Sequence, residues 1–268
     1  MRIFAISDLH VDYEENRSWV QGISESAHQQ DILILAGDIS DNLELLDMTL
    51  SQLREKFRKL LFIPGNHELW VRGAKENCSL QKFSQVNALC KALDIETGLL
   101  RMDGVAFVPL LGWYDYSFAA PDPALLRAWR DNSVCRWPSE LDSVAAVNEY
   151  FLALNAPLLQ TQDELVISYS HFLPRIDLMP ARIPEHKRNV YPVLGSTGLG
   201  RQVLTLRPAI HVYGHSHVNR SVSLDGIRYV NNAYGYPNEA RIARKQLLCI
   251  HDTAMDPEIA TVAKQPAG

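Results

Sequence analysis

The sequence predicts an α/β fold, and three observations support this prediction. Short apolar segments of strand length recur along the chain, segments of helical periodicity lie between several of them, and polar or glycine-rich turns follow them. Strands that alternate with helices favour largely parallel pairing with helices packed on the sheet faces. The chain has 268 residues, 47% of them hydrophobic, so we expect a single domain over residues 1–268.

Six of the apolar segments are expected to form strands. Most are aliphatic at successive positions, which is typical of strands buried on both faces. They span 2–7, 32–36, 60–63, 105–109, 165–169 and 210–213. After His217, two more strands are expected at 228–232 and 246–251, without a long helix between them. This part of the chain is therefore expected to pair antiparallel, and the residues after Asp252 are expected to fray.

Two segments show a clear helical period. In 43–57, four leucines and one phenylalanine recur at spacings of three and four, which places them on one helical face. Either Asp41 or Asn42 is the expected cap of this helix. A second apolar face recurs over 141–154, and Ser139, with an acidic residue three positions later, is its expected capping residue.

Two stretches fit neither period. The segment 112–138 is rich in tryptophan and tyrosine, and we expect a long excursion with one short helix. Such an excursion is either functional or a satellite hydrophobic cluster at the sheet edge. The segment 174–197 is irregular and basic, and its cations could bind an acidic or phosphorylated substrate. The candidates are Arg182, His186, Lys187 and Arg188.

The composition excludes several classes of protein. The net charge is −5, which disfavours a broad nucleic-acid-binding surface. The four cysteines are scattered without a C-x-x-C pair, so neither a disulfide framework nor a thiolate zinc site is expected. The apolar segments are too short for a membrane span, and the N-terminal one is too short for a signal peptide. A reducing cytoplasm is the expected compartment.

Polar residues follow five of the predicted strands directly. Because ligands of open α/β sheets bind at the carboxyl ends of the strands, these residues are expected to form one site. The set mixes carboxylate, imidazole and carboxamide groups without sulfur, which suits Mn, Fe, Zn or similar ions. The candidate metal ligands are Asp8, His10, Asp38, Asn66, His171, His215 and His217.

The spacing within each group supports this interpretation. Side chains two positions apart in an extended chain point the same way, so Asp8 and His10 can reach one ion while Leu9 faces the core. A glycine precedes each of Asp38, Asn66 and His215 and permits a tight turn there. Each group alone is common, but an ordered set of five at five strand ends is poorly explained by chance.

The order D-x-H, G-D, G-N-H-E, H and G-H-x-H resembles the signature of the calcineurin-like metallophosphoesterase superfamily, and it runs from Asp8 to His217. This resemblance implies a four-layer α/β/β/α sandwich of two mixed sheets, with the metal site at the C-terminal ends of the strands. It also implies two divalent or mixed-valence transition-metal ions that share Asp38. One ion would take Asp8, His10, Asp38 and His217, and the other Asp38, Asn66, His171 and His215.

The resemblance also implies a role for His67, which would contact the phosphate or protonate the leaving oxygen. Asn66 and His67 are adjacent and should point apart, which supports a role for His67 outside the ligand set. Related members place an acid near Asp41 to orient this histidine, so Asp41 is a candidate partner as well as a candidate helix cap. Two ions about 3.5–4 Å apart would activate a bridging hydroxide for attack on phosphorus.

One departure narrows the branch of the superfamily. Asn42 stands where the Ser/Thr protein phosphatases carry an arginine, so the chain is closer to the small bacterial phosphoesterases and phosphodiesterases. The expected substrate is a small phosphorylated molecule, either a monoester or a diester. A nuclease of the same superfamily and a non-catalytic metal-dependent binding or scaffold protein are the alternatives. No feature of the sequence specifies an oligomeric state.

Overall fold

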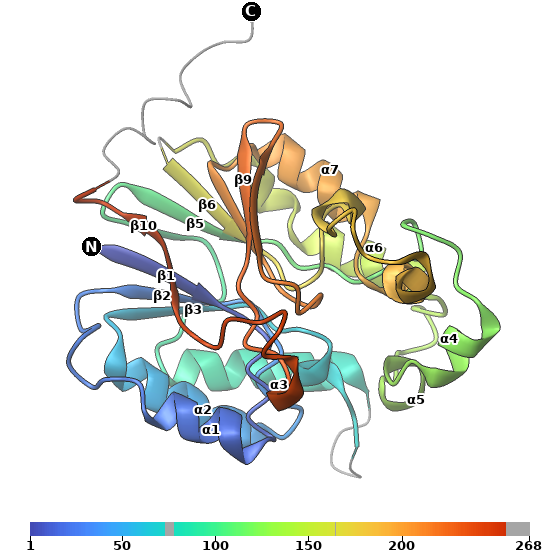
Figure 1. Cartoon of the computed structure of the whole chain (residues 1–268), viewed down its shortest axis with the longest axis horizontal. Helices are drawn as coiled ribbons and strands as arrows, with labels where there is room; N and C mark the ends of the chain where they lie inside the picture. The colour runs from blue at the N-terminus through green and yellow to red at the C-terminus, as the bar shows by residue number, and fades with distance from the viewer. Residues whose placement is uncertain (73–77, 164, 256–268) are drawn as a thin grey trace, which may run out of the picture.

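The computed structural model describes residues 1–72, 78–163 and 165–255. Two β-sheets pack face to face, and helices cover both outer faces (Figure 1). One sheet has four strands in the order β10-β1-β2-β3, and the other has six in the order β4-β5-β6-β7-β9-β8. The expected four-layer α/β/β/α arrangement of two mixed sheets is therefore confirmed.

The four-stranded sheet contains the first three strands of the chain and its last described strand. Its strands are β1 (Arg2–Ile6), β2 (Ile32–Leu35), β3 (Lys59–Phe62) and β10 (Leu248–Asp252). β1, β2 and β3 are parallel, and β10 joins β1 antiparallel, as expected for the C-terminal part of the chain. The helices α1 (Glu14–Gln21), α2 (Leu43–Lys56) and α3 (Ser79–Ala92) lie on its outer side (Figure 1).

The six-stranded sheet follows. Its strands are β4 (Leu100–Met102), β5 (Val105–Pro109), β6 (Leu165–Tyr169), β7 (Ile210–Tyr213), β8 (Arg220–Leu224) and β9 (Ile227–Asn231). β5, β6, β7 and β9 are parallel, while β4 and β8 pair antiparallel at the two edges. The helices α6 (Val144–Leu154) and α7 (Thr197–Leu206) lie outside it (Figure 1).

Alternate residues of each central strand face different layers. In β1, Ile3 and Ala5 belong to the core between the two sheets, whereas Phe4 and Ile6 belong to the core beneath the helices. The same alternation in β5 places Phe107 between the sheets and Ala106 under the outer helices. Because both faces are buried, the strands contain almost no polar residues, which explains their continuous apolar sequence.

The sequence prediction of the helix caps is confirmed for one helix and wrong for the other. Asn42, not Asp41, caps α2, and its side-chain oxygen accepts hydrogen bonds from the backbone N–H groups of Glu44 and Leu45. α6 begins at Val144 with Ser143 as its cap, so the expected cap at Ser139 is wrong. The hydrophobic period begins as early as Leu141, before the helix, because this residue packs against the same core as the helix.

The two irregular stretches are more ordered than expected. The 112–138 excursion carries two short helices, α4 (Pro123–Ala128) and α5 (Asp131–Val134), not one. It is anchored by Trp113 and Tyr114, which are each 1% exposed within the core under the six-stranded sheet. The 174–197 stretch forms the 3-10 helices η3 (Ile176–Leu178) and η4 (Glu185–Val193) before α7 begins.

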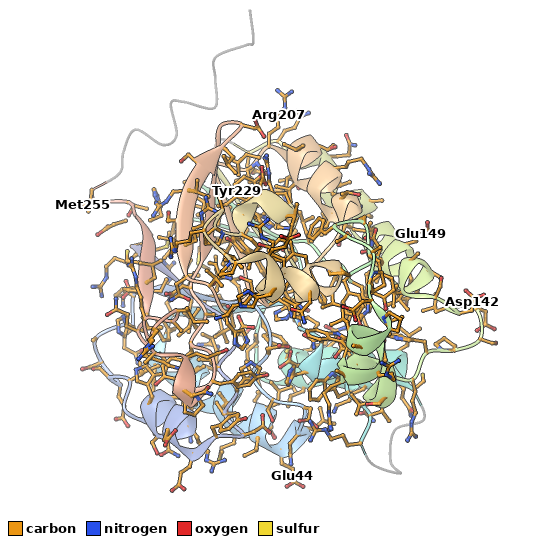
Figure 2. The ribbon with its side chains drawn as sticks, turned by 45° about the vertical axis from the view of Figure 1, so that its right-hand side comes forward. Glu44, Asp142, Glu149, Arg207, Tyr229 and Met255 are labelled. Atoms are coloured by element: carbon orange, nitrogen blue, oxygen red, sulfur yellow. The ribbon has the colours of Figure 1, made fainter. Side chains whose placement is uncertain are left out.

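Charged side chains are concentrated on the outer helices and loops. Glu44 on α2, Glu149 on α6 and Asp142 before α6 are exposed and project from the molecule (Figure 2). None of the described helices is long and apolar enough to cross a membrane. The frayed segment expected after Asp252 lies mostly outside the described residues, since 253–255 form a turn and the description ends there.

Candidate metal centre

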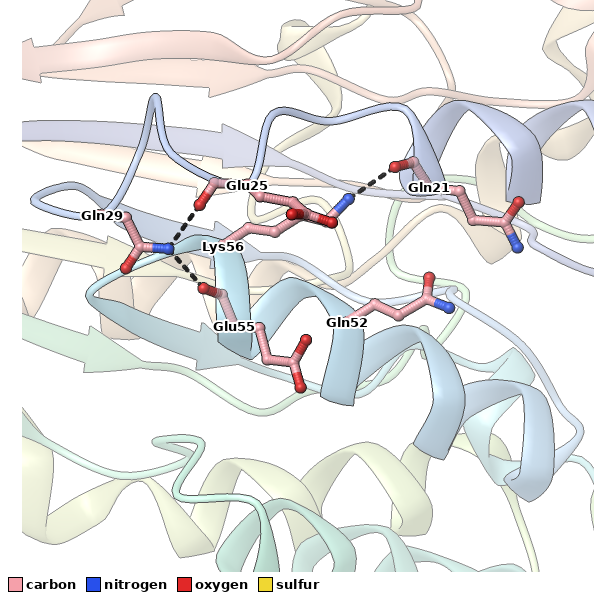
Figure 3. Close-up of a pocket in the computed structure, with 6 residues that line it drawn as sticks. All are labelled: Gln21, Glu25, Gln29, Gln52, Glu55 and Lys56. Atoms are coloured by element: carbon pink, nitrogen blue, oxygen red, sulfur yellow. Dashed lines mark hydrogen bonds between the residues drawn. The ribbon is translucent and has the colours of Figure 1, made fainter.

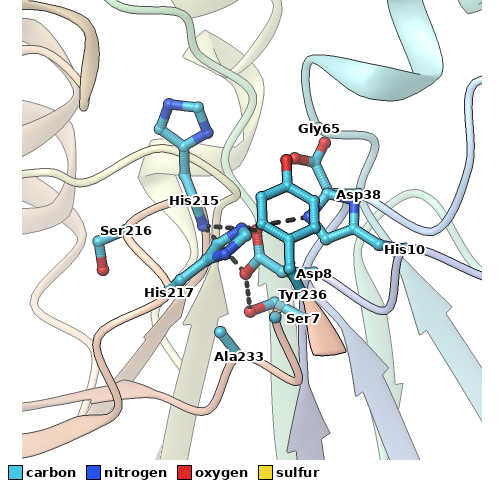
Figure 4. Close-up of polar contacts among 12 residues, drawn as sticks. Ser7, Asp8, His10, Asp38, Gly65, His215, Ser216, His217, Ala233 and Tyr236 are labelled. Carbon is cyan, nitrogen blue, oxygen red and sulfur yellow. Dashed lines mark hydrogen bonds and ion pairs between the residues drawn. The ribbon is translucent and has the colours of Figure 1, made fainter. Parts of the chain in front are cut away.

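The predicted metal ligands converge where the carboxyl ends of both sheets meet. Loops after β1, β2 and β3 supply Asp8, His10, Asp38 and Asn66, and loops after β6 and β7 supply His171, His215 and His217. Backbone hydrogen bonds join the first two loops, from Asp8 N to Gly37 O at 2.9 Å and from His10 N to Asp38 O at 3.0 Å. Figure 4 shows the resulting cluster around Asp8 and Asp38.

Five of the seven ligands have a left-handed backbone. The φ angles are 53° at Asp8, 42° at His10, 57° at Asp38, 64° at His215 and 54° at His217. Each such residue costs on the order of 1–3 kcal/mol and persists only where the surroundings enforce it. The extended geometry expected for Asp8 and His10 is therefore wrong, although Leu9 between them is buried in the core as predicted.

One triad of ligand atoms lies on the β1 side. Asp8, His10 and His217 offer ligand atoms within 4.8 Å of one another. The Nε2 atoms of His10 and His217 are 3.2 Å apart, and His217 Nε2 lies 3.3 Å from Asp8 Oδ1. The Asp8 carboxylate also accepts from the backbone N–H of His215 at 3.1 Å, so it is held by both sheets.

A second triad comprises Asp38, His171 and His215. His171 Nε2 lies 3.4 Å from Asp38 Oδ2 and 3.0 Å from His215 Nδ1. The side-chain oxygen of Asn66 lies 3.2 Å from the same His171 nitrogen. The structure thus brings all seven predicted ligands close together, and their division between two ions, as the resemblance implies, stays a prediction.

The hydrogen bonds around the imidazoles show that the cluster fits a cation. A carbonyl oxygen only accepts, so His171 donates its Nδ1–H to Ala36 O at 2.8 Å, and His215 donates its Nε2–H to Val193 O at 3.0 Å. In the neutral rings, the remaining nitrogens, which are 3.0 Å apart, would both present lone pairs. Lone pairs at this distance repel unless a positive charge lies between them.

The close packing of carboxylates and imidazoles also shifts the pKa values of the candidate ligand histidines. Although burial opposes the charged form, Asp38 and Asp8 raise the pKa of His171 to about 9. Burial also disfavours the charged form of His217, but Asp8 and Glu239 outweigh it and raise the pKa of His217 to about 10. A proton on each of these rings therefore competes directly with a metal ion. Burial lowers the pKa of His215 to about 3, so this ligand is already neutral.

Close backbone approach explains the glycine before Asn66. A Cβ at Gly65 would lie 2.2 Å from Asp38 Oδ1 and 2.7 Å from His171 Cε1. Gly37 is different, because its φ of 83° and its contact with His171 both exclude a side chain. The sequence argument from tight turns thus applies to Gly37, whereas the glycine at 65 is needed for space.

His67 lies at the mouth of the cluster. Its ring stacks on Trp70 with centroids 3.7 Å apart and meets the ring of His10 edge-on at 4.7 Å. Its Nε2 is 3.8 Å from Asp38 Oδ2, and its side chain is 13% exposed. The ligand atoms of His10, Asp38 and His67 also lie within 4.8 Å of one another, so the geometry allows His67 to face either a substrate or an ion.

Asp41 makes different contacts from those expected. Its carboxylate accepts from Arg72 Nε at 2.9 Å, and the Arg72 guanidinium lies 4.8 Å from the ring centroid of Trp70. Among the described contacts, no hydrogen bond joins Asp41 to His67. Burial raises the pKa of Asp41, while Arg72 and, more weakly, His67 oppose this shift. Its role as a partner of His67 stays a prediction, with Arg72 and Trp70 lying between them.

Asp131, at the start of α5, is a site residue that the sequence analysis missed. It is 2% exposed, and its Oδ1 accepts from Asn66 Nδ2 at 2.9 Å and from Trp70 Nε1 at 2.6 Å. Its Oδ2 accepts from Trp129 Nε1 at 2.9 Å. Asp131 thereby fixes the Asn66 amide with its oxygen toward His171. The aromatic excursion is thus both a hydrophobic cluster and a support of the site.

Glu239 and Tyr236, from the segment after β9, were also missed. Glu239 Oε2 accepts from His217 Nδ1 at 2.6 Å and from the backbone N–H of Tyr236 at 2.7 Å. The Tyr236 ring stacks on His10 at 4.4 Å between centroids and lies beside His217 (Figure 4). Carboxylates that orient ligand histidines in this way raise the basicity of the ligand. No sequence motif marks these positions, because they reach the site only through the fold.

Glu68, which follows His67 in the loop after β3, has a structural role. Its fully buried carboxylate accepts from four backbone N–H groups, those of Asp38, Ile39, Ser40 and Gly65, at 2.6 to 3.1 Å. It therefore ties the loop after β2 to the loop after β3. These bonds hold the left-handed turn at Asp38 in place.

The four basic candidates in the 174–197 stretch are all exposed. Arg188 donates to Ile183 O and Ala181 O, so it stabilises its own loop. Arg182 lines a groove beside strand β8. Binding of substrate by Arg182, His186, Lys187 and Arg188 stays a prediction, whereas Val193 at the end of the same stretch does reach the metal centre through His215.

A separate depression of about 500 Å³ lies between α1 and α2 and is lined by Gln21, Glu25, Gln29, Gln52, Glu55 and Lys56 (Figure 3). It contains none of the candidate ligands. Its lysine donates to the backbone oxygens of Val20, Gln21 and Ile23. These bonds give Lys56 a structural role, and the depression does not extend the site.

Known proteins share both the motifs and the fold. The family model described as calcineurin-like phosphoesterase matches residues 1–219. The chain is 24% identical to the [acyl-carrier-protein] phosphodiesterase PptH of Mycobacterium tuberculosis, over 96% of this chain and 85% of that protein. The crystal structure of phosphopantetheinyl hydrolase (PptH) from the same organism superposes with a TM-score of 0.77 at 23% identity, covering 96% of this chain and 97% of the other.

Proposed function

This chain belongs to the calcineurin-like phosphoesterase family, and from that premise we propose that it is a phosphodiesterase whose substrate is a carrier protein bearing a phosphopantetheinyl group. The family consists of metal-dependent hydrolases of phosphate esters, so the expected enzyme class is confirmed. The diester preference and the protein substrate are inferred from PptH, a relative similar over nearly the whole of this chain. A protein substrate replaces the small molecule expected from the sequence.

The convergence of the seven ligands carries the proposal. Six of their donor atoms form two triads of oxygen and nitrogen, with the Asn66 oxygen beside the second, and the imidazole hydrogen bonds direct ring lone pairs into the centre. This donor set fits two ions of the Mn, Fe or Zn type, with Asp8, His10 and His217 around one and Asp38, Asn66, His171 and His215 around the other. Asp38 groups with His171 and His215 and also with His10 and His67, which supports its proposed role as the ligand that both ions would share.

The metals would supply a water-derived nucleophile at neutral pH and offset the charge of the phosphoryl oxygens. The residues of the chain contribute position and proton transfer. His67, at the mouth of the site, would protonate the leaving oxygen in this proposal, and its stacking on Trp70 limits the orientations of its ring. Asp131 and Glu239 keep Asn66 and His217 in the orientations that direct their donor atoms inward.

Turnover of three substrates by the Mn²⁺-loaded protein tests the proposal. We expect hydrolysis of bis-p-nitrophenyl phosphate, slower hydrolysis of p-nitrophenyl phosphate, and release of the phosphopantetheinyl group from holo-acyl-carrier protein, followed by intact mass. Asp38→Asn should abolish all three. A preference for the monoester would indicate a phosphatase instead, and a fully metal-loaded protein that turns over none of them would contradict the proposal.

A further inference from the structure

A groove with a basic lining lies next to the segments that carry His217 and Glu239. None of the candidate metal ligands lines it. Two adjoining depressions of about 490 and 240 Å³ form it, and both are lined by Arg182 and Asn219. We call this surface the basic groove. Its polar lining comprises Arg182, Asn219, Arg220, Arg241, Arg244, Lys245 and Gln246. Among the residues that the structure describes, no acidic one lines it, although the chain as a whole has a net charge of −5.

Two of the segments that line the groove directly follow residues of the metal centre in the sequence. On one side, Val218 and Asn219 directly follow the metal ligand His217. On the other side, Ala240 directly follows Glu239, which holds His217 through its Nδ1. A ligand in the groove would therefore contact two segments that each begin directly after a residue of the metal centre.

The cations of the groove divide into two kinds. Lys245 donates to Gly235 O and Tyr236 O, and Arg220 donates to Leu178 O, so these two support the backbone. Arg182, Arg241 and Arg244 are exposed, and no carboxylate pairs with them among the described residues. Three exposed guanidinium groups are thus free to bind carboxylates, which guanidinium groups can bind through two parallel hydrogen bonds.

The lining favours a polypeptide over a nucleic acid. Ile242, between the two arginines, is 45% exposed, and Ala240 lines the same wall, so apolar contacts alternate with cations. The described lining of the groove contains no aromatic side chain, although stacking on aromatic rings is the usual means of holding single-stranded bases. On an enzyme with a net negative charge, a local basic surface of this kind is a favourable place for an acidic partner to bind.

We propose that the basic groove docks an acidic polypeptide segment of the protein that carries the phosphodiester. This inference rests on the proposed function, because it assigns the part of the substrate that lies outside the metal centre. Arg241 and Arg244 are specificity residues: they select the carrier and do not contact the phosphorus.

Charge reversal tests this assignment. The variant Arg241→Glu/Arg244→Glu should raise the KM for holo-acyl-carrier protein by about tenfold or more, since each rim charge affects encounter more than chemistry. Its kcat and its turnover of bis-p-nitrophenyl phosphate should stay unchanged. The control Arg201→Glu/Arg207→Glu makes the same change in net charge on and just after α7, where both residues are exposed. In Figure 2, Arg207 lies at the outer edge of the molecule.

Three results would overturn the proposal: an unchanged KM, an equal rise in KM in the control, or a matching loss of bis-ester turnover. A binding measurement decides the case in which the carrier protein is not a substrate. Labelled poly-L-glutamate should bind the wild-type enzyme, and the groove variant should bind it at least about tenfold more weakly by fluorescence anisotropy.

The same assay separates the two kinds of polyanion. A single-stranded oligonucleotide of equal charge should bind more weakly than poly-L-glutamate, and tighter binding of the oligonucleotide would contradict the polypeptide assignment. Failure of the proposed function is recognised independently, because the wild-type enzyme would then leave holo-acyl-carrier protein intact, while the binding assay would still test the groove.

Discussion

At the scale of single residues, hydrogen bonds decide which atoms of the site face inward. His171, His215 and His217 each use one ring nitrogen on a fixed acceptor, so the other nitrogen is directed to the centre. Asn66 is oriented in the same way by Asp131. Orientation of this kind is important because an amide or imidazole turned the other way would present an N–H group to a cation.

His67→Ala should separate chemistry from coordination. We expect the variant to retain both metals and to lose about 10²–10⁴ in turnover, since a general acid contributes that much. Metal content by plasma emission and turnover of bis-p-nitrophenyl phosphate measure the two effects, with Asp38→Asn as the variant that should lose both. Loss of a metal from His67→Ala would instead make His67 a ligand beside His10 and Asp38.

Asp131→Ala should weaken metal binding without touching a ligand. We expect a loss of about 10–100-fold in metal affinity, typical of the removal of an outer hydrogen-bond partner, with turnover restored by excess Mn²⁺. The matched control is Asp122→Ala, which removes a carboxylate from the same excursion, where it caps α4. Equal metal affinity in both variants would show that Asp131 does not orient Asn66.

At the scale of secondary structure, the loops after the strands are held in conformations that their sequences alone do not favour. The left-handed residues at 8, 10 and 38 are stabilised by backbone hydrogen bonds between two loops. The four backbone hydrogen bonds that the Glu68 carboxylate accepts stabilise them further. The loop after β3 contributes the close approach at Gly65. Precise placement of the ligands therefore depends on contacts among three consecutive strand–loop units.

Gly65→Ala tests this dependence. The added methyl group would overlap both Asp38 and His171, so we expect a loss of about 1–3 kcal/mol in the free energy of unfolding together with impaired metal binding. Gly98→Ala serves as the control, because the nearest neighbour of its Cβ would be Glu96 Oε1 at 3.4 Å, an ordinary contact. Thermal unfolding and metal content measure both variants, and similar behaviour of the two would contradict the packing argument.

At the scale of the whole molecule, the metal centre joins the two sheets. Each triad combines ligands from the four-stranded sheet with ligands from the six-stranded sheet, and Asp8 also accepts a backbone bond from His215. An ion bound to either triad therefore crosslinks the two halves of the sandwich. A ligand that binds only the folded state raises its stability in proportion to RT ln(1 + [L]/Kd).

Mn²⁺ should accordingly raise the melting temperature, and the rise should be larger at pH 8 than at pH 6. The pKa values of His171 and His217, about 9 and about 10, mean that protons compete with the ion more strongly as the pH falls. Differential scanning fluorimetry with and without a chelator measures the shift. Asp38→Asn should reduce it sharply, and a shift that is equal at both pH values would contradict the competition.

The sequence by itself determined the fold class, most of the strands and all seven candidate ligands. Strands buried on both sides must be apolar throughout, and polar groups at their ends stand out against that background, so both signals are local. The same locality explains why the helices at 43–57 and 141–154 were recognised while their caps were partly misplaced. Capping depends on one hydrogen bond, which a short sequence pattern does not specify uniquely.

The tertiary structure alone decided what surrounds those ligands. Asp131 and Glu239 lie 65 and 22 residues from the ligands they hold, and the basic groove combines residues near 182, 219 and 241. Contacts between residues so far apart leave no periodic pattern in the sequence, because the pattern of each segment reflects only its own local structure. The motifs specify where metals can bind, and the packing of distant segments sets their geometry and shapes the groove where we propose the carrier protein docks.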